Sequence, residues 1–186
     1  MDTELPVRKS PEKKRSEGIY DWVESLVTAV IACILIFLFL FRVVNVDGSS
    51  MVPTLHNADK VIVSRLSRNV SRGDIVVLTK VSFADECLVK RVIATEGQTI
   101  DIDFDAGIVY VDGEALQEPY IADATHRRLD FSGPVTVPEN CVFCMGDNRN
   151  NSSDSRRSTI GMIDTRCIIG KVVLRIWPFS RFGTVS

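Results

Sequence analysis

Residues 88–94 read LVKRVIA, a run of aliphatic residues with two adjacent cations at its centre. Its Val and Ile content predicts a β-strand, in which successive side chains point to opposite faces. Lys90 then lies on one face and Arg91 on the other, each between two aliphatic neighbours. The stretch therefore predicts a strand with apolar surroundings and one cation on each face.

A lysine on an apolar face can act as a base. Removal from water disfavours the charged amine, so we expect the pKa of Lys90 to fall below its ordinary value of about 10.4. A neutral amine can take a proton from a hydroxyl, whereas the neighbouring Arg91 stays protonated. The alternative is an edge-strand lysine whose stem covers apolar surface while its amine reaches water.

Similar runs continue the β pattern along the chain. Val- and Ile-rich segments occur at residues 60–63, 75–79, 88–94, 99–102, 108–111, 135–137, 142–145 and 168–176. Turn signals separate them, at residues 72–74, 96–97, 105–107, 112–113 and 138–140. Residues 122–133 are polar and irregular, and neither a long helical period nor an internal repeat follows residue 45. The pattern predicts a mostly β fold, with one antiparallel β domain.

A candidate nucleophile precedes these strands. Residues 46–55 read VDGSSMVPTL, with adjacent hydroxyls at Ser49 and Ser50. Serine is a weak nucleophile unless a neighbouring base takes its proton. Taken alone, the Asp-Gly pair and the proline favour an ordinary turn over a catalytic site.

A polar stretch follows the predicted strand at 142–145. Residues 146–156 read GDNRNNSSDSR and contain no apolar side chain. If Asp154 pairs with Arg156, and Asp147 with a nearby cation, the stretch forms an ordered loop. The alternative is a loop that is simply solvated.

The apolar run before the β domain has the length of a membrane span. Residues 23–41 read VESLVTAVIACILIFLFLF, with Glu24 as the one charge. At about 1.5 Å per residue, such a helix is roughly 28 Å long, close to the ~30 Å hydrocarbon core of a bilayer. A cleavable signal peptide would have a shorter apolar region and a small-x-small site after it, and residues 42–45 read RVVN. We therefore expect a single membrane anchor.

Charge asymmetry predicts the orientation of this anchor in the cell membrane. The N-terminal side is rich in basic residues: Arg8, Lys9, Lys13, Lys14 and Arg15. The positive-inside rule places this side in the cytoplasm, with Tyr20 and Trp22 at the inner interface. The expected organisation is a basic cytoplasmic tail over residues 1–19, unstructured up to residue 17, an anchor over 20–44 and an extracytoplasmic β domain over 45–186. Ser50, nine residues beyond Phe41, then lies within about 30 Å of the membrane.

Composition limits the partners and cofactors. With 22 basic and 24 acidic residues and a net charge of −2, the chain gives no reason to expect a nucleic-acid partner. Cys141 and Cys144 form a CxxC, but no second pair at matching spacing completes a metal site. In a strand, residues three apart face opposite sides. We expect buried, unreactive thiols, no metal and no cofactor.

Taken together, these motifs carry a family resemblance. SSMVPTL at residues 49–55, LVKRVIA at 88–94 and GDNRNNSSDSR at 146–156 follow in that order behind the anchor. GDIVVL at 73–78, YVDGEALQEPYI at 110–121 and IIGKVVLRIWPF at 168–179 add to the pattern. From about residue 20 to residue 179 the chain resembles the type I signal peptidases, in particular the compact Gram-positive type.

The resemblance implies a Ser–Lys endopeptidase with a β-rich signal peptidase fold. Ser50 matches the nucleophile and Lys90 matches the general base. Ser152 matches the serine whose hydroxyl orients the lysine amine. Met51 and Pro53 match positions that shape the turn around the nucleophile.

The resemblance also implies two supporting ion pairs. Asp154 and Arg156 match residues that stabilise the catalytic loop. Asp147 and Arg91 resemble a second pair of this kind.

One position departs from part of the family. Gly48 stands where some members carry a hydroxyl that helps to hold the oxyanion. The oxyanion hole would then use main-chain donors, chiefly the Ser50 N–H. His56 and His126 match no catalytic position, so a Ser–His–Asp triad is not expected.

The implied activity is removal of signal peptides from secreted precursors at small residues in positions −1 and −3, with precursors and membrane lipid as partners. Near the C-terminus, Trp177, Phe179 and Phe182 suit the outer membrane interface, and ordinary end-of-strand packing is the alternative. A self-cleaving repressor-type protease also pairs Ser with Lys, but it would carry a DNA-binding domain in place of an anchor. An inactive leader-binding homologue in a translocation assembly is the remaining alternative, and the combination of a serine, a lysine and a second serine at family positions argues against it.

Overall fold

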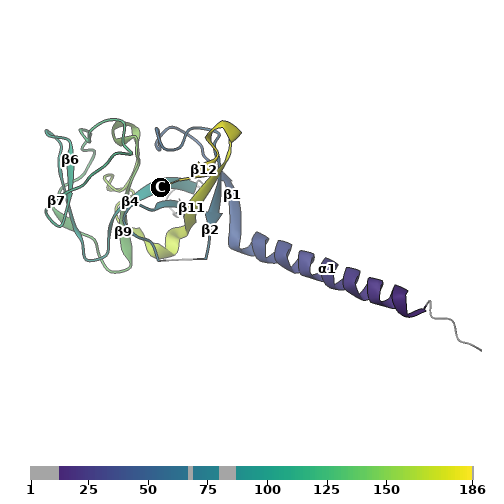
Figure 1. Ribbon diagram of the computed structural model, residues 1–186. Helices are drawn as coiled ribbons and strands as arrows, with labels where there is room; N and C mark the ends of the chain where they lie inside the picture. The colour runs from purple at the N-terminus through teal and green to yellow at the C-terminus, as the bar shows by residue number, and fades with distance from the viewer. Residues whose placement is uncertain (1–12, 67–68, 80–86, 186) are drawn as a thin grey trace, which may run out of the picture. The chain divides into compact units, whose positions relative to one another are not determined.

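The computed structural model describes residues 13–66, 69–79 and 87–185 (Figure 1). By its internal contacts the chain divides into two units, Met1–Phe39 and Leu40–Ser186. The first contains one helix, and the second contains all of the β-strands.

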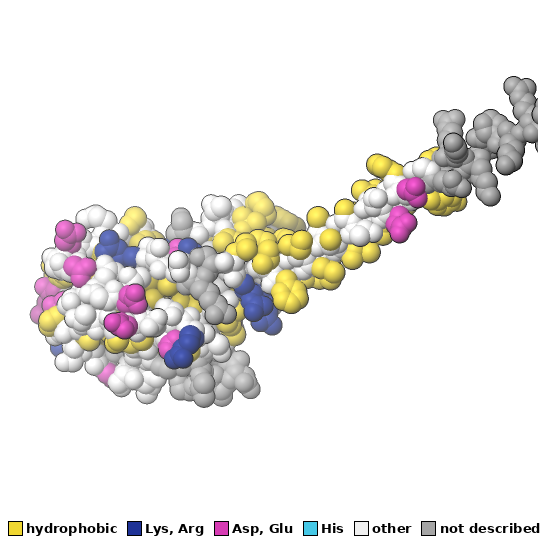
Figure 2. Space-filling view, turned by 90° about the horizontal axis from the view of Figure 1, so that it is seen from below, with side chains coloured by type: hydrophobic (Ala, Val, Ile, Leu, Met, Phe, Trp, Pro, Cys, Tyr) yellow, Lys and Arg dark blue, Asp and Glu magenta, His cyan; other side chains and the backbone are white. Residues whose placement is uncertain are grey.

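The helix α1 spans Lys13–Leu40, and its residues Gly18–Leu40 are long and apolar enough to cross a membrane. Hydrophobic side chains line its visible surface along much of its length, with a strip of other side chains and backbone between them (Figure 2). Residues 1–12 of the expected basic tail, including Arg8 and Lys9, lie outside the described residues. The helix begins at Lys13, earlier than expected, because Lys, Arg and Glu are good helix formers that extend a helix already begun by the apolar run.

The expected anchor and the helix end at different residues. The helix ends at Leu40, and strand β1 spans Phe41–Asn45, where the anchor was expected to continue to residue 44. β1 pairs in register with β2, with Phe41 opposite Ser64 and Asn45 opposite Lys60. The β-branched pair Val43–Val44 favours this extended pairing, which a hydropathy reading does not detect. The β unit therefore begins at the end of the helix.

The larger sheet has eight strands. They are β1, β2 (Lys60–Ser64), β3 (Ile75–Thr79), β4 (Cys87–Thr95), β9 (Cys141–Met145), β10 (Ile163–Asp164), β11 (Ile168–Trp177) and β12 (Gly183–Thr184). Their order is β1-β2-β11-β3-β4-β9-β10, and β12 pairs with β11.

A smaller sheet of four strands has the order β7-β6-β5-β8. The strands are β5 (Thr99–Asp103), β6 (Ile108–Val111), β7 (Glu114–Ala115) and β8 (Val135–Thr136). The helices of this unit are single 3₁₀ turns: η1 (Arg149–Asn151), η2 (Thr165–Cys167) and η3 (Phe179–Arg181). The recorded strand pairs are all antiparallel, which confirms the predicted mostly β fold behind one N-terminal apolar helix.

Strand β4 lies inside the larger sheet and is buried on both faces. It pairs with β3 on one side, with Lys90 opposite Val76, and with β9 on the other, with Arg91 opposite Met145. Hydrophobic clusters cover both faces. The edge-strand alternative for Lys90 is thus wrong, because its side chain cannot reach water from an interior strand.

Candidate active site

The two residues expected to carry the chemistry are in contact. Lys90 Nζ on β4 donates a hydrogen bond to Ser50 Oγ at 2.8 Å and another to the Val89 carbonyl at 3.0 Å. The Lys90 side chain is almost fully buried, with 3% exposure, and Ser50 is half-buried in the turn after β1. A buried amine therefore lies beside a hydroxyl that remains within reach of a substrate.

The surroundings of Lys90 favour its neutral form. Burial lowers the pKa of the Lys90 amine below its ordinary value, and this effect outweighs the negative charges of Asp154 and Asp147, which act in the opposite direction. Because an amine in water is strongly hydrated, its removal from water is the dominant cost of keeping it charged.

Buried apolar residues anchor the turn that carries Ser50. Met51 and Leu55 are buried in the cluster beneath the turn, and the Leu55 N–H donates to the Met51 carbonyl. The Asn148 N–H donates to the Ser50 carbonyl at 3.0 Å and so ties the turn to the polar loop at residues 146–156. Pro53, by contrast, is exposed at the surface of the turn.

The main-chain amides of Gly48 and Ser50 differ in whether they are hydrogen-bonded. Gly48 has a φ of +84°, a left-handed conformation that favours glycine, and its N–H donates to Asn57 Oδ1 at 2.9 Å. The Ser50 N–H makes no hydrogen bond within the described part of the chain. Of these two amides, the Ser50 N–H is the one free to donate a hydrogen bond to an oxyanion.

Gly146 is a position that the sequence reasoning did not single out. A Cβ built on Gly146 would lie 2.5 Å from the Ser50 carbonyl oxygen and 2.3 Å from Ser152 Oγ. Such distances are too short for any side chain, so glycine is required where the polar loop approaches the nucleophile turn. In the sequence, the one indication of this role is that Gly146 stands directly after a predicted strand and before a polar loop.

Ser152 lies in the same place but is not hydrogen-bonded to the lysine amine. Its side chain is buried, and Oγ has no partner of suitable distance and angle among the described residues. The hydroxyl is close enough to the Asp154 carboxylate to help lower the pKa of that group. The structure thus brings Ser152 to the site, and its expected role in orienting Lys90 remains a prediction.

The expected pair Arg91–Asp147 forms a two-pronged ion pair. Arg91 Nε and Nη2 each donate to one Asp147 oxygen at 2.8 Å, and both side chains are buried. Thr54, from the nucleophile turn, donates to the same carboxylate. The Tyr120 ring lies 3.9 Å from the Arg91 guanidinium carbon. This pair therefore joins the residue after Lys90 to the turn that carries Ser50.

The expected pair Asp154–Arg156 closes the polar loop. Arg156 Nη2 and Asp154 Oδ2 are 2.9 Å apart, and both side chains are fully buried. Asp154 also accepts the Gly146 N–H at 3.1 Å, and Arg156 donates to the Arg149 carbonyl. Burial alone would raise the pKa of Asp154, but the hydrogen bonds and charge of Arg156 keep it below its ordinary value. The alternative of a merely solvated loop is wrong.

A third buried ion pair was not predicted. Arg149 pairs with Glu118 and also donates to Thr125 at 3.0 Å. Burial and the Glu118 charge raise the pKa of the nearby Tyr120 to about 12. Arg149 belongs to the polar stretch at 146–156 and Glu118 to YVDGEALQEPYI, but nothing in the sequence indicated that the two residues form an ion pair.

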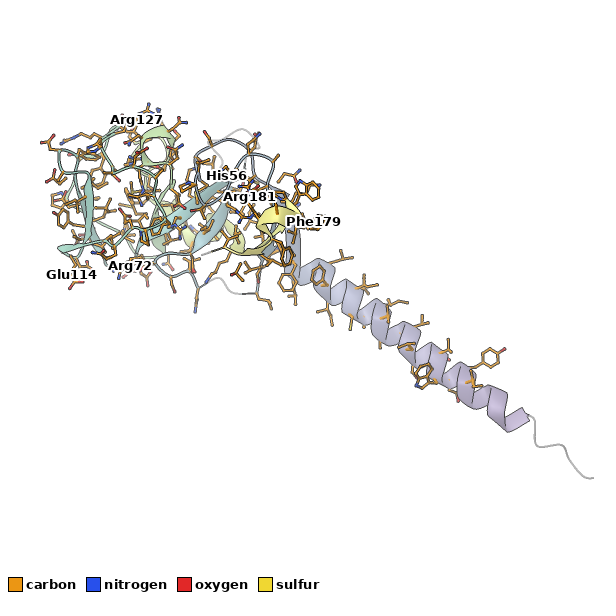
Figure 3. All side chains as sticks on the ribbon, turned by 45° about the horizontal axis from the view of Figure 1, so that its top comes forward. His56, Arg72, Glu114, Arg127, Phe179 and Arg181 are labelled. Atoms are coloured by element: carbon orange, nitrogen blue, oxygen red, sulfur yellow. The ribbon has the colours of Figure 1, made fainter. Side chains whose placement is uncertain are left out.

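Neither the histidines nor the cysteines among the described residues form a hydrogen bond with Ser50 or Lys90, and the histidines have other partners. His56 Nδ1 contacts Arg181 (Figure 3), and His126 Nδ1 contacts the Phe104 carbonyl. Cys144 is buried, which raises the pKa of its thiol, and Cys141 is half-buried. The described residues contain no group of three or more His, Cys, Asp or Glu side chains suited to a metal ion.

Comparisons with known proteins identify the family of this chain. Residues 19–177 match the family model described as signal peptidase, peptidase S26. The chain is 37% identical over 183 residues to signal peptidase I S of Bacillus subtilis (strain 168), covering 92% of this chain and 96% of that protein. It is 38% identical over 186 residues to a signal peptidase I of Bacillus licheniformis, with 92% and 95% covered.

A crystal structure of a signal peptidase I from Enterococcus faecalis V583 is also similar, with 26% identity, a TM-score of 0.47, and coverage of 55% of this chain and 96% of that chain. The family model matches well over half of the chain, and both relatives are more than 30% identical over nearly their whole length. This chain belongs to the signal peptidase family, peptidase S26.

Proposed function

We propose that this chain is a membrane-anchored serine endopeptidase that removes signal peptides from secreted precursor proteins. The single observation that carries the proposal is the 2.8 Å contact between Lys90 Nζ and Ser50 Oγ in a chain of this family. A serine and a buried lysine in contact form a nucleophile–base pair of the kind that replaces histidine in Ser–Lys proteases.

In the proposed reaction Lys90 begins as a neutral amine. The Ser50 hydroxyl then donates to Lys90 Nζ and transfers its proton as Oγ attacks the carbonyl carbon of the scissile peptide bond. The protonated Lys90 next gives this proton to the departing amine, and an acyl-enzyme remains on Ser50. Lys90 then takes a proton from an incoming water, which attacks the ester carbonyl. The protonated Lys90 gives this proton to Ser50 Oγ as the ester bond breaks, which releases the acid product and restores the neutral amine.

Two other groups support the reaction. The unpaired Ser50 N–H is suited to donate to the oxyanion of each tetrahedral intermediate. The buried Ser152 hydroxyl lies in the same centre and is suited to orient Lys90 when substrate excludes water. Gly48 adds no side-chain donor, so the oxyanion hole consists of main-chain groups.

The side of the membrane follows from the basic residues before the span. The positive-inside rule puts the N-terminus in the cytoplasm and the β unit outside, where a precursor emerges after translocation. The precursor would bind as an extended strand, with small residues at −1 and −3 entering shallow apolar pockets.

Incubation of the detergent-solubilised full chain with a precursor, followed by mass analysis of both product ends, tests the proposal. The expected result is a single cut after a small residue, abolished in Ser50→Ala and in Lys90→Ala at unchanged melting temperature. Folded variants that keep full activity would remove the roles assigned to these residues. Precursor that binds to the native chain but is never cut would instead favour an inactive leader-binding homologue.

A further inference from the structure

Two arginines without an ion-pair partner among the described residues lie next to each other where the β unit begins. Arg42 is on β1, opposite Val63 of β2. Arg65 follows β2 directly, and its N–H donates to the Leu40 carbonyl at 2.9 Å, which continues the same ladder. Alternation along a strand places Arg65 on the face that Val63 shares with Arg42. The two arginines are thus diagonal neighbours, with Cα atoms about 7–8 Å apart.

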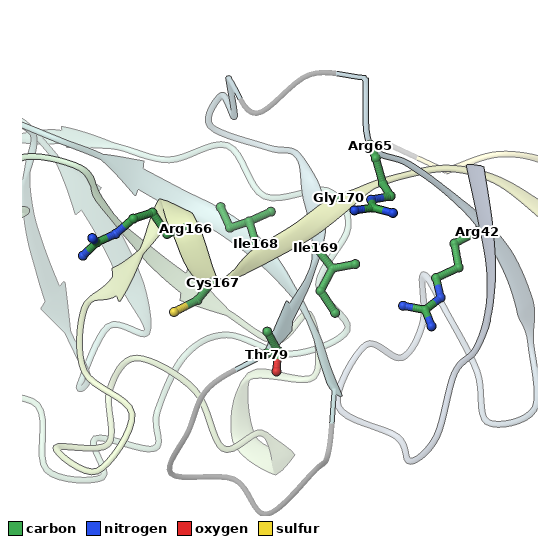
Figure 4. A pocket seen from close by; sticks show the side chains of 8 residues that line it. All are labelled: Arg42, Arg65, Thr79, Arg166, Cys167, Ile168, Ile169 and Gly170. Atoms are coloured by element: carbon green, nitrogen blue, oxygen red, sulfur yellow. The ribbon is translucent and has the colours of Figure 1, made fainter. Parts of the chain in front are cut away.

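The strand beside them leaves a hollow. Gly170 of β11 packs directly on β2, since a Cβ there would lie 2.3 Å from the Ser64 carbonyl oxygen. A cavity of about 360 Å³ opens here, with Ile169 and the two arginines in its wall (Figure 4). No Asp or Glu of the described residues lines it. The size suits a small polar group, since binding pockets of roughly 300–1,000 Å³ hold small molecules.

The positive charge in this hollow is only partly balanced. Arg166, which also lines it, is paired with Asp164 at 2.6 Å. Neither Arg42 nor Arg65 has an ion pair with a described carboxylate. Two guanidinium groups that line one hollow repel each other, and an anion bound between them would remove that repulsion. Phosphate matches the paired N–H donors of guanidinium especially well.

The position of Arg42 in the chain identifies the source of the phosphate. The apolar span ends at Leu40, and Arg42 is two residues further on, so their Cα atoms are at most about 7.6 Å apart. A residue this close to the end of a membrane span lies at the depth of the lipid headgroups. We propose that Arg42 and Arg65 bind the headgroup phosphate of an anionic phospholipid at the membrane face of the β unit.

This site is separate from the proposed catalytic centre. Ser50 follows the far end of β1, and this strand of five residues is about 17 Å long. The inference therefore depends neither on the peptidase mechanism nor on which side of the membrane the β unit occupies. Removal of the two arginines should leave precursor cleavage in lipid-free detergent unchanged.

Titration of the full chain in non-ionic detergent micelles with short-chain lipids tests the proposal. Dihexanoyl phosphatidylglycerol, dihexanoyl phosphatidylcholine and inorganic phosphate are added in separate arms at constant ionic strength. Native mass spectrometry counts bound lipid, and the melting temperature reports affinity. We expect one saturable phosphatidylglycerol, with a melting temperature raised by a few degrees, and much weaker effects from the other two additives.

The Arg42→Gln/Arg65→Gln variant should bind phosphatidylglycerol about tenfold more weakly or worse. The matched control, Arg72→Gln/Arg128→Gln, removes the same charge elsewhere and should bind as the wild type does. If the double variant does not fold, each single variant should still weaken binding by a smaller factor.

Equal binding of the two lipids, or unchanged affinity in the arginine variants, would overturn the proposal. An equal effect of inorganic phosphate would mean an adventitious ion only and would overturn the lipid assignment. Loss of precursor cleavage in every preparation, with lipid binding intact, would count against the proposed function alone.

Discussion

The burial of Lys90 determines the pH at which the proposed site can work. Burial lowers the pKa of this amine although Asp154 and Asp147 lie near enough to raise it. The reaction needs the neutral amine, and the neutral fraction grows as pH rises through the lowered pKa. We expect kcat/KM for a precursor peptide to rise with pH, with a midpoint below pH 10.5, the ordinary pKa of lysine.

The measurement is a set of cleavage rates from pH 6 to pH 10 on the detergent-solubilised full chain. Near-UV circular dichroism over the same range controls for unfolding. A flat profile would rule out Lys90 as the base.

Gly146 offers a test of how closely the two halves of the site must approach. In Gly146→Ala the new methyl group would lie 2.5 Å from the Ser50 carbonyl oxygen, so the nucleophile turn or the polar loop must shift. Because a displacement of about 1 Å can cost about 100-fold in rate, we expect a fall in kcat of that order. Steady-state kinetics of the variant measure this fall. Gly18→Ala, where the new Cβ meets nothing within 4 Å, is the control and should keep wild-type activity.

Single residues differ in how far the sequence revealed their surroundings. Lys90 was recognisable because an apolar strand surrounds it, and Arg156 because Asp154 is two residues away. Arg149 and Glu118 were not, since they are 31 positions apart and only the folded chain brings them together. The hydrogen-bond partners of Ser152 depend on side-chain rotation, which residue order does not specify.

The loop at residues 146–156 acts as one element because its charges are buried. Arg156 and Asp154 have fully buried side chains, so removal of the cation leaves a carboxylate without its partner. We expect Arg156→Gln to lower the free energy of unfolding at pH 7 by about 3–5 kcal/mol. Urea unfolding in detergent micelles measures the loss. Arg166→Gln removes an arginine from an exposed pair and should change the free energy of unfolding very little.

The same variant has a distinctive pH dependence. In the wild type Arg156 holds the pKa of Asp154 below 3.8, so this stabilisation is complete above pH 3.8 and is lost as pH falls through the lowered pKa. Without Arg156, burial dominates and raises the pKa of Asp154 above its unfolded value. Protonation of Asp154 in acid then removes the cost of a buried, unpaired carboxylate, so the variant loses less stability. The gap between wild type and variant should be smaller at pH 4 than at pH 7. An equal gap at both values would contradict the assignment to Asp154.

The strands show where sequence patterns suffice and where they fail. The eight Val- and Ile-rich runs all correspond to strands, with ends that differ by no more than one residue. The strands not predicted are β1, β7, β10 and β12. Three of them are two residues long and depend on a partner strand for their definition, while β1 was hidden in the hydrophobic run of the anchor. A local run of Val and Ile therefore predicts strands whose own side chains are buried. The two-residue strands are defined only by their pairing with a neighbouring strand.

At the scale of the whole molecule, three neighbouring strands form a ribbon that carries a basic residue at one end and an aromatic residue at the other. The ribbon is β1-β2-β11, with Arg42 at the end where the span stops. At the other end, Trp177 of β11 lies opposite Lys60, which also faces Asn45. Contact of both ends with lipid would lay the ribbon along the membrane and bring the Ser50 turn to the bilayer surface, where a membrane-bound leader is presented.

The aromatic end provides the test of this orientation. Trp177, Phe179 and Phe182 are 47%, 75% and 59% exposed, as suits a membrane interface, and Trp177 packs edge-on against Phe179. The chain has two tryptophans, so Trp22→Phe leaves Trp177 as the single indole fluorophore. In nanodiscs with brominated lipid acyl chains, we expect strong quenching of Trp177, because its ring should sit at the headgroup boundary.

The reciprocal variant, Trp177→Phe, retains Trp22 near the start of the apolar span and reports insertion of the anchor. Phe179→Ala/Phe182→Ala in the Trp22→Phe background should reduce the quenching, since it removes two of the three rings. If Trp177 fluorescence is unquenched while Trp22 is quenched, the aromatic residues are ordinary end-of-strand packing. The Ser50 turn would then be held near the membrane by its tether to the anchor alone.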